Sequence, residues 1–354
     1  MRGMLQSVAA GAVFLVMGGL WTATITGQDG SLAQTASVVA VPTAPGQPSS
    51  GPGSSDYSHA AYQAGWGGAG ADRFWLFTPD QPRPTSAPLV VFLHGWGATE
   101  PSIYGAWIKH LVRRGNIVLF PRYQAGLRDL PKEMTGHAVN AIRSGIDRLQ
   151  AGPVRPDLTR VAFVGHSLGA IMSANIAGRA ERYDVPRPAA LFLAEPTFAP
   201  ALGSYDQIAP DTLLAVVVGA DVKRDASAMR ILQGSSLVPP SNKLYVAIPS
   251  DHHGSPPLVS DHFAPCAAER LGDTAGEVDD EWRLRTRDAL DYFGYWRRAD
   301  ALLDAAFAGQ HRDLALGDSP QLRFMGAWSD GTPVREAIVR SFSLNDADRA
   351  DASR

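Results

Sequence analysis

The sequence lacks the features that mark most metal, nucleotide and nucleic-acid proteins. One cysteine, Cys266, in 354 residues excludes an internal disulfide framework. The net charge of −3 comes without a clustered basic run, which argues against a nucleic-acid-binding face. There is no H-E-x-x-H, no paired cysteine, no P-loop, and no G-x-G-x-x-G after the first expected strand. We therefore expect no metal, no organic cofactor and no nucleic-acid partner.

The N-terminus has the pattern of a targeting segment. A positive start at Arg2 precedes an uncharged apolar run over residues 8–20, which a threonine-rich stretch extends to residue 27. We interpret residues 1–27 as a signal peptide, with a membrane anchor as the alternative, since about 20 residues span a bilayer. No cysteine lies nearby to carry a lipid. We expect a secreted or periplasmic protein, or one held at the membrane by this segment.

The rest of the chain divides by composition. Residues 37–56 are rich in Pro, Gly, Ser and Thr, so residues 28–56 are expected to form a flexible linker. Residues 57–310 are expected to form the folded domain, and residues 311–354 a C-terminal extension.

Short apolar runs alternate with helical patterns throughout residues 57–310. This alternation favours a mostly parallel sheet with helices on both faces, and no insertion is long enough for a large cap. The expected strands are residues 73–78, 89–93, 116–120, 160–164, 189–194, 213–218 and 243–248, and the expected helices are residues 103–114, 134–150, 170–180, 226–233 and 283–307.

The segment Gly165-His166-Ser167-Leu168-Gly169 stands between an expected strand and an expected helix. Such an abrupt turn lifts its middle side chain off the sheet, and small residues on either side let the chain pass. The free N–H groups of the helix N-terminus then point at the serine. We interpret Ser167 as a nucleophile.

A serine nucleophile needs a base and an orienting carboxylate, both from loops at the carboxyl ends of strands. After the last clear strand come His252 and His253. Their side chains point in different directions, so only one can face the serine. We prefer His253, because Gly254 allows a sharp turn; His252 is the alternative, and His262 is a lesser candidate.

For the carboxylate we prefer Asp221, which lies just past the strand 213–218. Glu195 is the alternative acid, because it directly follows the strand 189–194. Asp225 is a third candidate, better explained as a charge at a helix N-terminus.

An oxyanion formed during acyl transfer needs two N–H donors. We assign one to the backbone of Leu168, the residue after the nucleophile. The other is assigned to Trp96, whose flanking glycines let the backbone approach a substrate carbonyl.

Together these residues resemble the α/β-hydrolase superfamily, in which the order is nucleophile, acid, histidine. The absence of a cap and the His94-Gly95-Trp96 loop are similar to the dienelactone-hydrolase-like, cutinase-like and platelet-activating-factor-acetylhydrolase-like esterases. The resemblance implies a serine esterase or lipase that cleaves small-molecule or lipid esters through an acyl-enzyme. The alternatives are an acyltransferase or peptidase on the same fold, or a non-catalytic binding protein.

Overall fold

The computed structural model describes residues 40–126, 129, 131–220, 225–272 and 286–340. Contacts divide the chain into Met1–Val41 and Pro42–Arg354. The described strands and helices all belong to the second unit. The expected signal or anchor segment, residues 1–27, lies outside the described residues.

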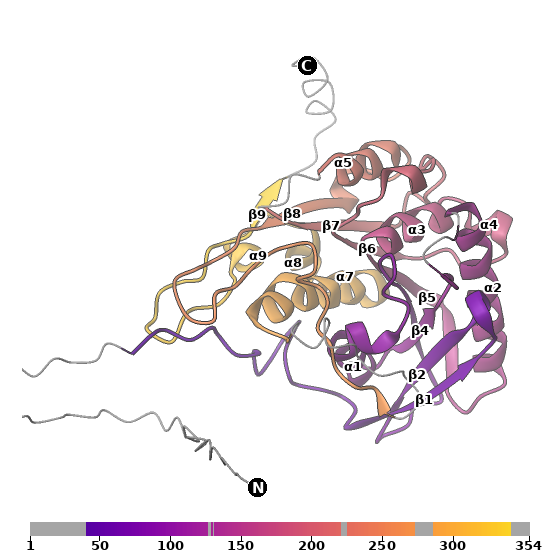
Figure 1. The fold of residues 1–354 in the computed structure, drawn as a ribbon, viewed down its shortest axis with the longest axis horizontal. Helices are drawn as coiled ribbons and strands as arrows, with labels where there is room; N and C mark the ends of the chain where they lie inside the picture. Colours follow the sequence, from indigo (N-terminus) through magenta and orange to yellow (C-terminus); the bar gives the residue numbers. More distant parts are fainter. Residues whose placement is uncertain (1–39, 127–128, 130, 221–224, 273–285, 341–354) are drawn as a thin grey trace, which may run out of the picture. The chain divides into compact units, whose positions relative to one another are not determined.

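A nine-stranded sheet runs through the described part of the chain, in the order β1-β2-β4-β3-β5-β6-β7-β8-β9 (Figure 1). The six strands from β4 to β8 are parallel to one another, whereas β1, β2 and β9 pair antiparallel with their neighbours. The strands are β1 Ala61–Gly67, β2 Phe74–Asp80, β3 Ser86–Leu93, β4 Ile117–Pro121, β5 Arg155–His166, β6 Ala190–Ala194, β7 Leu213–Gly219, β8 Lys243–Ile248 and β9 Ile338–Arg340.

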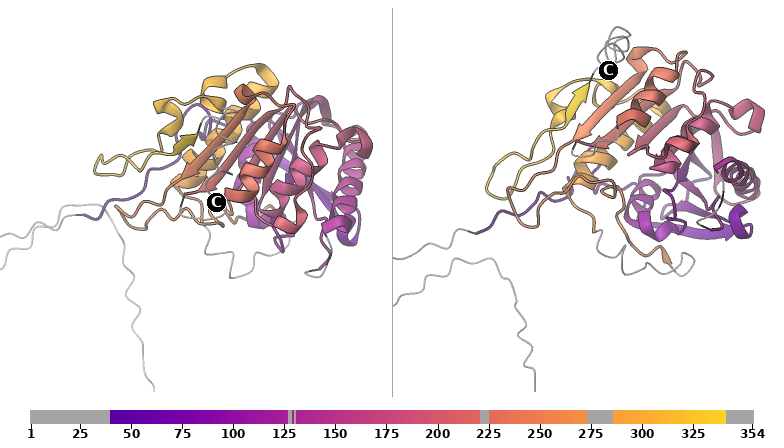
Figure 2. Two further views of the ribbon diagram at one scale, coloured as in Figure 1. Left: turned by 90° about the horizontal axis from the view of Figure 1, so that it is seen from above. Right: turned by 45° about the horizontal axis from the view of Figure 1, so that its top comes forward.

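Helices cover both faces of this sheet (Figure 2). One face packs against α1 and α7, and the other against α2, α3 and α5. The helices are η1 Gly70–Asp72, η2 Pro101–Tyr104, α1 Gly105–Arg113, α2 Pro131–Gln150, α3 Leu168–Ala177, α4 Ala180–Tyr183, η3 Ala199–Ala201, α5 Asp225–Gly234, η4 Pro240–Asn242, the π-helix η6 Leu290–Trp296, α7 Arg297–Ala308, α8 Arg312–Leu316 and α9 Pro320–Arg323.

The strand β3 shows why helices must cover both faces of the sheet. Val90 and Phe92 join the apolar cluster on the α1 and α7 face, whereas Leu89, Val91 and Leu93 join the cluster on the other face. All five side chains are fully buried. A continuous apolar run is what a central parallel strand requires, because side chains alternate between the two faces. The expectation of a doubly covered, mostly parallel sheet is confirmed, and only the short η3 lies between β6 and β7.

Two strands were missing from the sequence-based prediction. β1 contains two glycines and polar residues, and β9 has three residues, so neither has a strong apolar signal. Both lie at sheet edges, where one side needs no partner strand. The expected stop of β2 at Pro79 is wrong, since Pro79 pairs with Tyr62 and the strand runs on to Asp80.

Residues 42–56 do not behave as the flexible linker that their composition predicts. The N–H of Gly53 donates to the buried carboxylate of Asp300 at 2.8 Å, and Ser54 is fully buried. A Cβ at Gly53 would lie 2.5 Å from the carbonyl oxygen of Tyr292. The small residues here allow close packing against the π-helix. The folded unit therefore begins at Pro42 and not, as the composition predicts, at residue 57.

The C-terminal boundary also differs from the prediction. The segment after residue 310 contributes α8, α9 and the edge strand β9, and the side chain of Trp328 is buried. Residues 311–340 are therefore part of the same sheet and core, and the rest of the predicted extension lies outside the described residues.

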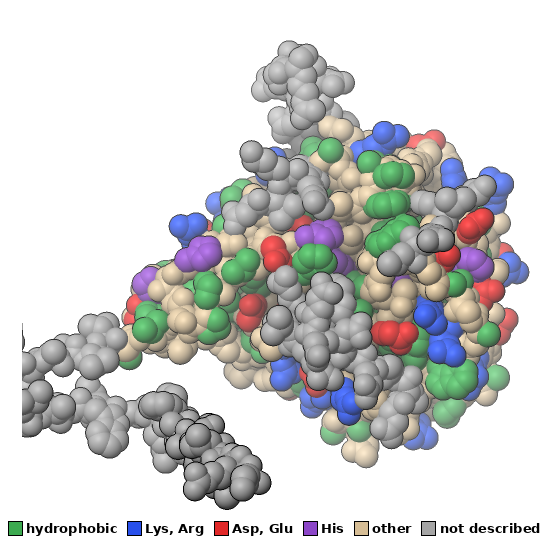
Figure 3. All heavy atoms as spheres, in the orientation of Figure 1, with side chains coloured by type: hydrophobic (Ala, Val, Ile, Leu, Met, Phe, Trp, Pro, Cys, Tyr) green, Lys and Arg blue, Asp and Glu red, His purple; other side chains and the backbone are tan. Residues whose placement is uncertain are grey.

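The visible face in Figure 3 carries acidic and basic side chains interspersed with one another. Among the described residues, no helix is long and apolar enough to cross a membrane.

Candidate active site

The turn between β5 and α3 has the geometry of a nucleophile elbow. Ser167 has φ 56° and ψ −121°, a backbone conformation that L-residues rarely adopt. A Cβ at Gly165 would lie 2.4 Å from the carbonyl oxygen of Gly169, and one at Gly169 would lie 2.0 Å from that of Leu93. Only glycine fits at either position. Strain of this kind is found at functional sites, where the surrounding structure enforces it.

The side chain that meets Ser167 is His262. Its Nε2 lies 2.9 Å from Ser167 Oγ, a hydrogen-bond distance suited to proton transfer. Ser167 is 8% exposed and the His262 side chain is 18% exposed, so the pair is shielded yet within reach of a substrate.

A buried carboxylate lies on the other side of this histidine. Glu195, 2% exposed, directly follows β6 and has φ 50°. Its Oε2 is 4.0 Å from His262 Nδ1, an ion-pair distance, and such contacts are often long before substrate binds. Its Oε1 accepts hydrogen bonds from the N–H of Gly219 and, at 3.2 Å, from the hydroxyl of Tyr295. Burial and the charge of Glu195 raise the pKa of Tyr295 well above its usual value, so the hydroxyl stays a donor.

The order along the chain is therefore Ser167, Glu195, His262, each at the carboxyl end of the parallel sheet or on a loop beyond it. The chlorophyllase family model matches residues 72–211. The chain has the α/β-hydrolase fold. The matched segment holds Ser167 and Glu195 and ends before His262. No curated protein matches the chain. The family match indicates a carboxylic ester hydrolase that acts on a small molecule.

In the loop after β3, side chains accept hydrogen bonds from the two backbone N–H groups that flank Trp96. The N–H of Gly95 donates to the Tyr104 hydroxyl at 2.9 Å, and that of Gly97 donates to Gln124 Oε1 at 2.9 Å. Within the described part of the chain, the N–H of Trp96 between them has no acceptor. Leu168 is the first residue of α3, so its N–H has no acceptor within the helix.

The Trp96 ring is partly buried and packs at the margin of the apolar cluster on the α2, α3 and α5 face. It stacks on Phe198 with the ring centres 5.0 Å apart and an angle of 26° between the planes. Phe198 lies three residues after Glu195 and has φ 124°. The two aromatic rings are only partly buried, so they form a wall on the loops around the elbow.

The preference for His253 as the base disagrees with this geometry. His253 is exposed, and its Nε2 lies 2.7 Å from Asp330 Oδ2. After β8 the chain makes an excursion closed by the pairing of Asp251 with Leu258, so His252 and His253 lie on the outward part. His262 follows the return. The physical reason for the error is this closed excursion, whose only sequence signal is the pair of prolines at 256 and 257.

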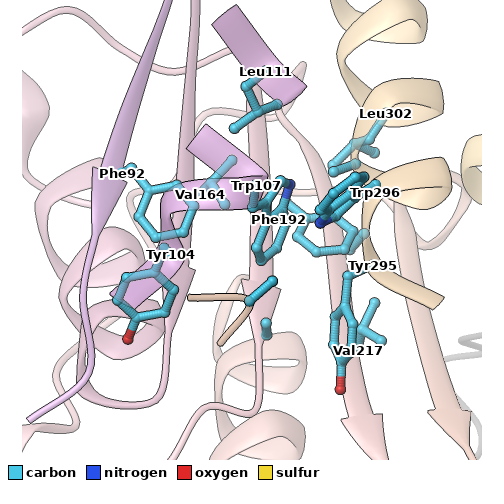
Figure 4. Packing of buried hydrophobic residues seen from close by; sticks show 14 of the residues in the cluster. Phe92, Tyr104, Trp107, Leu111, Val164, Phe192, Val217, Tyr295, Trp296 and Leu302 are labelled. Atoms are coloured by element: carbon cyan, nitrogen blue, oxygen red, sulfur yellow. The ribbon is translucent and has the colours of Figure 1, made fainter. Parts of the chain in front are cut away.

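The preferred acid, Asp221, lies outside the described residues. The alternative, Glu195, is the carboxylate that approaches the histidine. What sequence reasoning missed entirely is Tyr295, which reaches Glu195 from the π-helix η6. Figure 4 shows its hydroxyl and that of Tyr104 pointing the same way, toward the arrowhead ends of the strands.

Proposed function

We propose that the protein cleaves carboxylic esters through an acyl-enzyme, with Ser167 as nucleophile, His262 as base and Glu195 as the orienting acid. The observation that carries the proposal is the 2.9 Å contact between Ser167 Oγ and His262 Nε2 at a strained elbow. A serine with this backbone and this partner is arranged for acyl transfer.

The first step forms a bond between Ser167 Oγ and the carbonyl carbon while the serine proton moves to His262 Nε2. The carbonyl oxygen becomes an oxyanion, for which the N–H groups of Trp96 and Leu168 are the available donors. The leaving alkoxide then takes the proton from His262. Water, activated by the same nitrogen, attacks the acyl-enzyme and releases the acid.

Glu195 contributes a negative charge that stabilises the imidazolium formed at His262. Because Nε2 accepts from the serine, the neutral ring carries its proton on Nδ1, which faces Glu195. The carboxylate in turn is fixed by Gly219 and Tyr295.

The reacting ester belongs at the elbow and not in the cavity behind the loop after β8, residues 249–263, which carries His262 and is called the base loop below. That cavity, of about 500 Å³, is lined by Val259, Phe263, Cys266 and Leu290 among others, and Ser167 is not among its lining residues.

The test uses purified enzyme and p-nitrophenyl acetate. Ser167→Ala and His262→Ala should each lower kcat by at least about 10³-fold, as removal of triad members does in serine hydrolases. The matched control is His253→Ala, which should stay within about twofold, because its ring bonds an exposed aspartate. A fluorophosphonate probe should label the wild type and not the Ser167→Ala variant. Full activity in His262→Ala together with loss in His253→Ala would refute the assignment of the base.

A further inference from the structure

Behind the elbow lies a chain of buried hydrogen bonds that joins three separate loops of the site. The N–H of Gly95 donates to Tyr104 Oη at 2.9 Å, and that oxygen lies 2.8 Å from His166 Nδ1. On the other side of the ring, His166 Nε2 lies 2.8 Å from the carbonyl oxygen of His262. Tyr104 is fully buried and His166 is 2% exposed.

The direction of each hydrogen bond follows from its partners. The carbonyl of His262 can only accept, so His166 carries its proton on Nε2. Burial, with the neighbouring His262, lowers the pKa of His166 to about 3, so the ring is neutral and Nδ1 is bare. Tyr104 therefore donates to Nδ1, and burial raises the pKa of its hydroxyl well above the usual value. The oxygen of that hydroxyl accepts a hydrogen bond from the N–H of Gly95.

This chain fixes the two groups that Ser167 needs. By engaging the N–H of Gly95, Tyr104 holds the loop in which the Trp96 N–H is left free of protein acceptors in the described part of the chain. By donating to the backbone of His262, His166 holds the residue whose ring contacts Ser167 Oγ. His166 is also the residue before Ser167 in the sequence. The positions of the nucleophile, the base and the loop after β3 therefore all depend on the position of His166.

We propose that His166 is a positioning residue that fixes the base loop and the loop after β3 in place around Ser167. Its link to the loop after β3 is the Tyr104 hydroxyl, which bonds both His166 and Gly95. The inference rests on the proposed function, since it assigns a role in the acyl transfer described above. His166 touches no substrate and transfers no proton in the reaction. A displacement of about 1 Å in a reacting group costs on the order of 10²-fold in rate, which sets the size of the effect.

Two amide side chains separate the bonds of His166. His166→Gln can place an N–H donor where Nε2 stands and so keeps the bond to the carbonyl of His262. His166→Asn is shorter and keeps only an acceptor for Tyr104. Tyr104→Phe removes the acceptor for Gly95. The matched control is Tyr205→Phe, because Tyr205 is also buried and its hydroxyl also accepts a glycine N–H, that of Gly203 at 3.1 Å.

The measurements are kcat and KM for p-nitrophenyl acetate, with urea unfolding of every variant. We expect His166→Asn and Tyr104→Phe to lower kcat by about 100-fold with KM within about threefold. His166→Gln should restore kcat to within about tenfold of the wild type, and Tyr205→Phe should stay within about twofold. This rescue is independent of overall stability, which both His166 variants are expected to lower.

The inference is overturned if His166→Asn keeps its kcat, or if His166→Gln is no better than His166→Asn. Loss of kcat in Tyr205→Phe equal to that in Tyr104→Phe would also overturn it, because the effect would then follow from any buried tyrosine. A wild type that is neither active nor labelled by the fluorophosphonate would instead refute the proposed function. An active, Ser167-dependent enzyme that is indifferent to His166 refutes the positioning role alone.

Discussion

Replacing Glu195 by glutamine separates the charge of the proposed acid from its packing. Glutamine has nearly the same shape, and its amide oxygen can still accept the N–H of Gly219 and the hydroxyl of Tyr295. What the variant loses is the negative charge 4.0 Å from His262 Nδ1. A loss of rate that accompanies unchanged stability therefore reports on the contact between residue 195 and His262 and not on folding.

The magnitude follows from the distance and the burial. When His262 takes the serine proton it becomes an imidazolium beside the carboxylate. Two unit charges 4.0 Å apart attract by about 4 kcal/mol at an effective dielectric constant of about 20. Glu195 is 2% exposed and the His262 side chain 18%, so the attraction of about 1 kcal/mol expected in bulk water does not apply. Since about 1.4 kcal/mol is tenfold in rate, kcat/KM should fall by about a thousandfold.

The amide adds a second effect on the tautomer of the histidine. Its NH₂ group would face the Nδ1–H of His262, which favours the tautomer that cannot accept the serine proton. The corresponding change in the serine-protease template costs about 10⁴-fold, so the expected loss lies between about 10³-fold and 10⁴-fold. In addition, the acid limb of the kcat/KM profile should move to lower pH, because the imidazolium has lost its neighbouring negative charge.

The assay is p-nitrophenyl acetate hydrolysis across a pH series, with two comparison variants. Tyr295→Phe keeps the charge and removes one hydrogen bond to it, so a loss of about tenfold is expected. Asp221→Asn should remain within about threefold of the wild type. The reasoning is refuted if Asp221→Asn loses about 10³-fold and Glu195→Gln stays nearly normal, since the acid would then follow β7.

Two further predictions concern acid stability and export. Burial lowers the pKa of His166 to about 3 and that of His94 to about 4, from an ordinary 6.5, so the folded state binds fewer protons than the unfolded one between these values and stability falls as the pH drops below about 6.5. In urea unfolding between pH 6 and pH 4, His166→Gln should therefore lose stability less steeply than the wild type, by about 1.4 kcal/mol per pH unit; equal slopes would count against a neutral buried His166. From the positive start and apolar run of residues 1–27 we also propose that the protein works outside the cytoplasm, and fractionation that finds the full-length chain in the soluble cytosol would contradict this.

The fold and the strained turn at Ser167 could be predicted because their signals are local. Each central strand is a continuous apolar run, and the strained turn at Ser167 requires glycines two residues away on either side. The two edge strands, β1 and β9, have a weaker sequence pattern. Each pairs with a neighbouring strand on one side only, so it does not need a continuous apolar run. The π-helix η6 could not be predicted either, since its hydrogen-bond register depends on the packing around it and brings Tyr295 to Glu195.

The contact between His262 and Ser167 could not be predicted, because distant segments decide the path of the loop that carries His262. Gly254 suggested a sharp turn around His253, but its real constraint is space: a Cβ there would lie 2.3 Å from the carbonyl oxygen of Pro42. The buried carboxylate of Asp251 accepts hydrogen bonds from Trp328 Nε1 at 3.2 Å and from the N–H of Arg335 at 2.8 Å. None of these partners is near the loop in the sequence.

The same contacts show that the predicted linker and the predicted C-terminal extension contribute residues to the folded unit. The sequence predicts a linker over residues 28–56 and an extension over residues 311–354, both outside the catalytic domain. Yet the N–H of Ser255 donates to the carbonyl of Pro42, and Trp328 holds Asp251 at the start of the excursion that carries the chain to His262. A base loop fixed from both of these segments belongs to a folded unit that extends beyond residues 57–310. The boundary of the catalytic domain is therefore set by which segments hold the histidine in place, and by that criterion both Pro42 and Trp328 lie inside it.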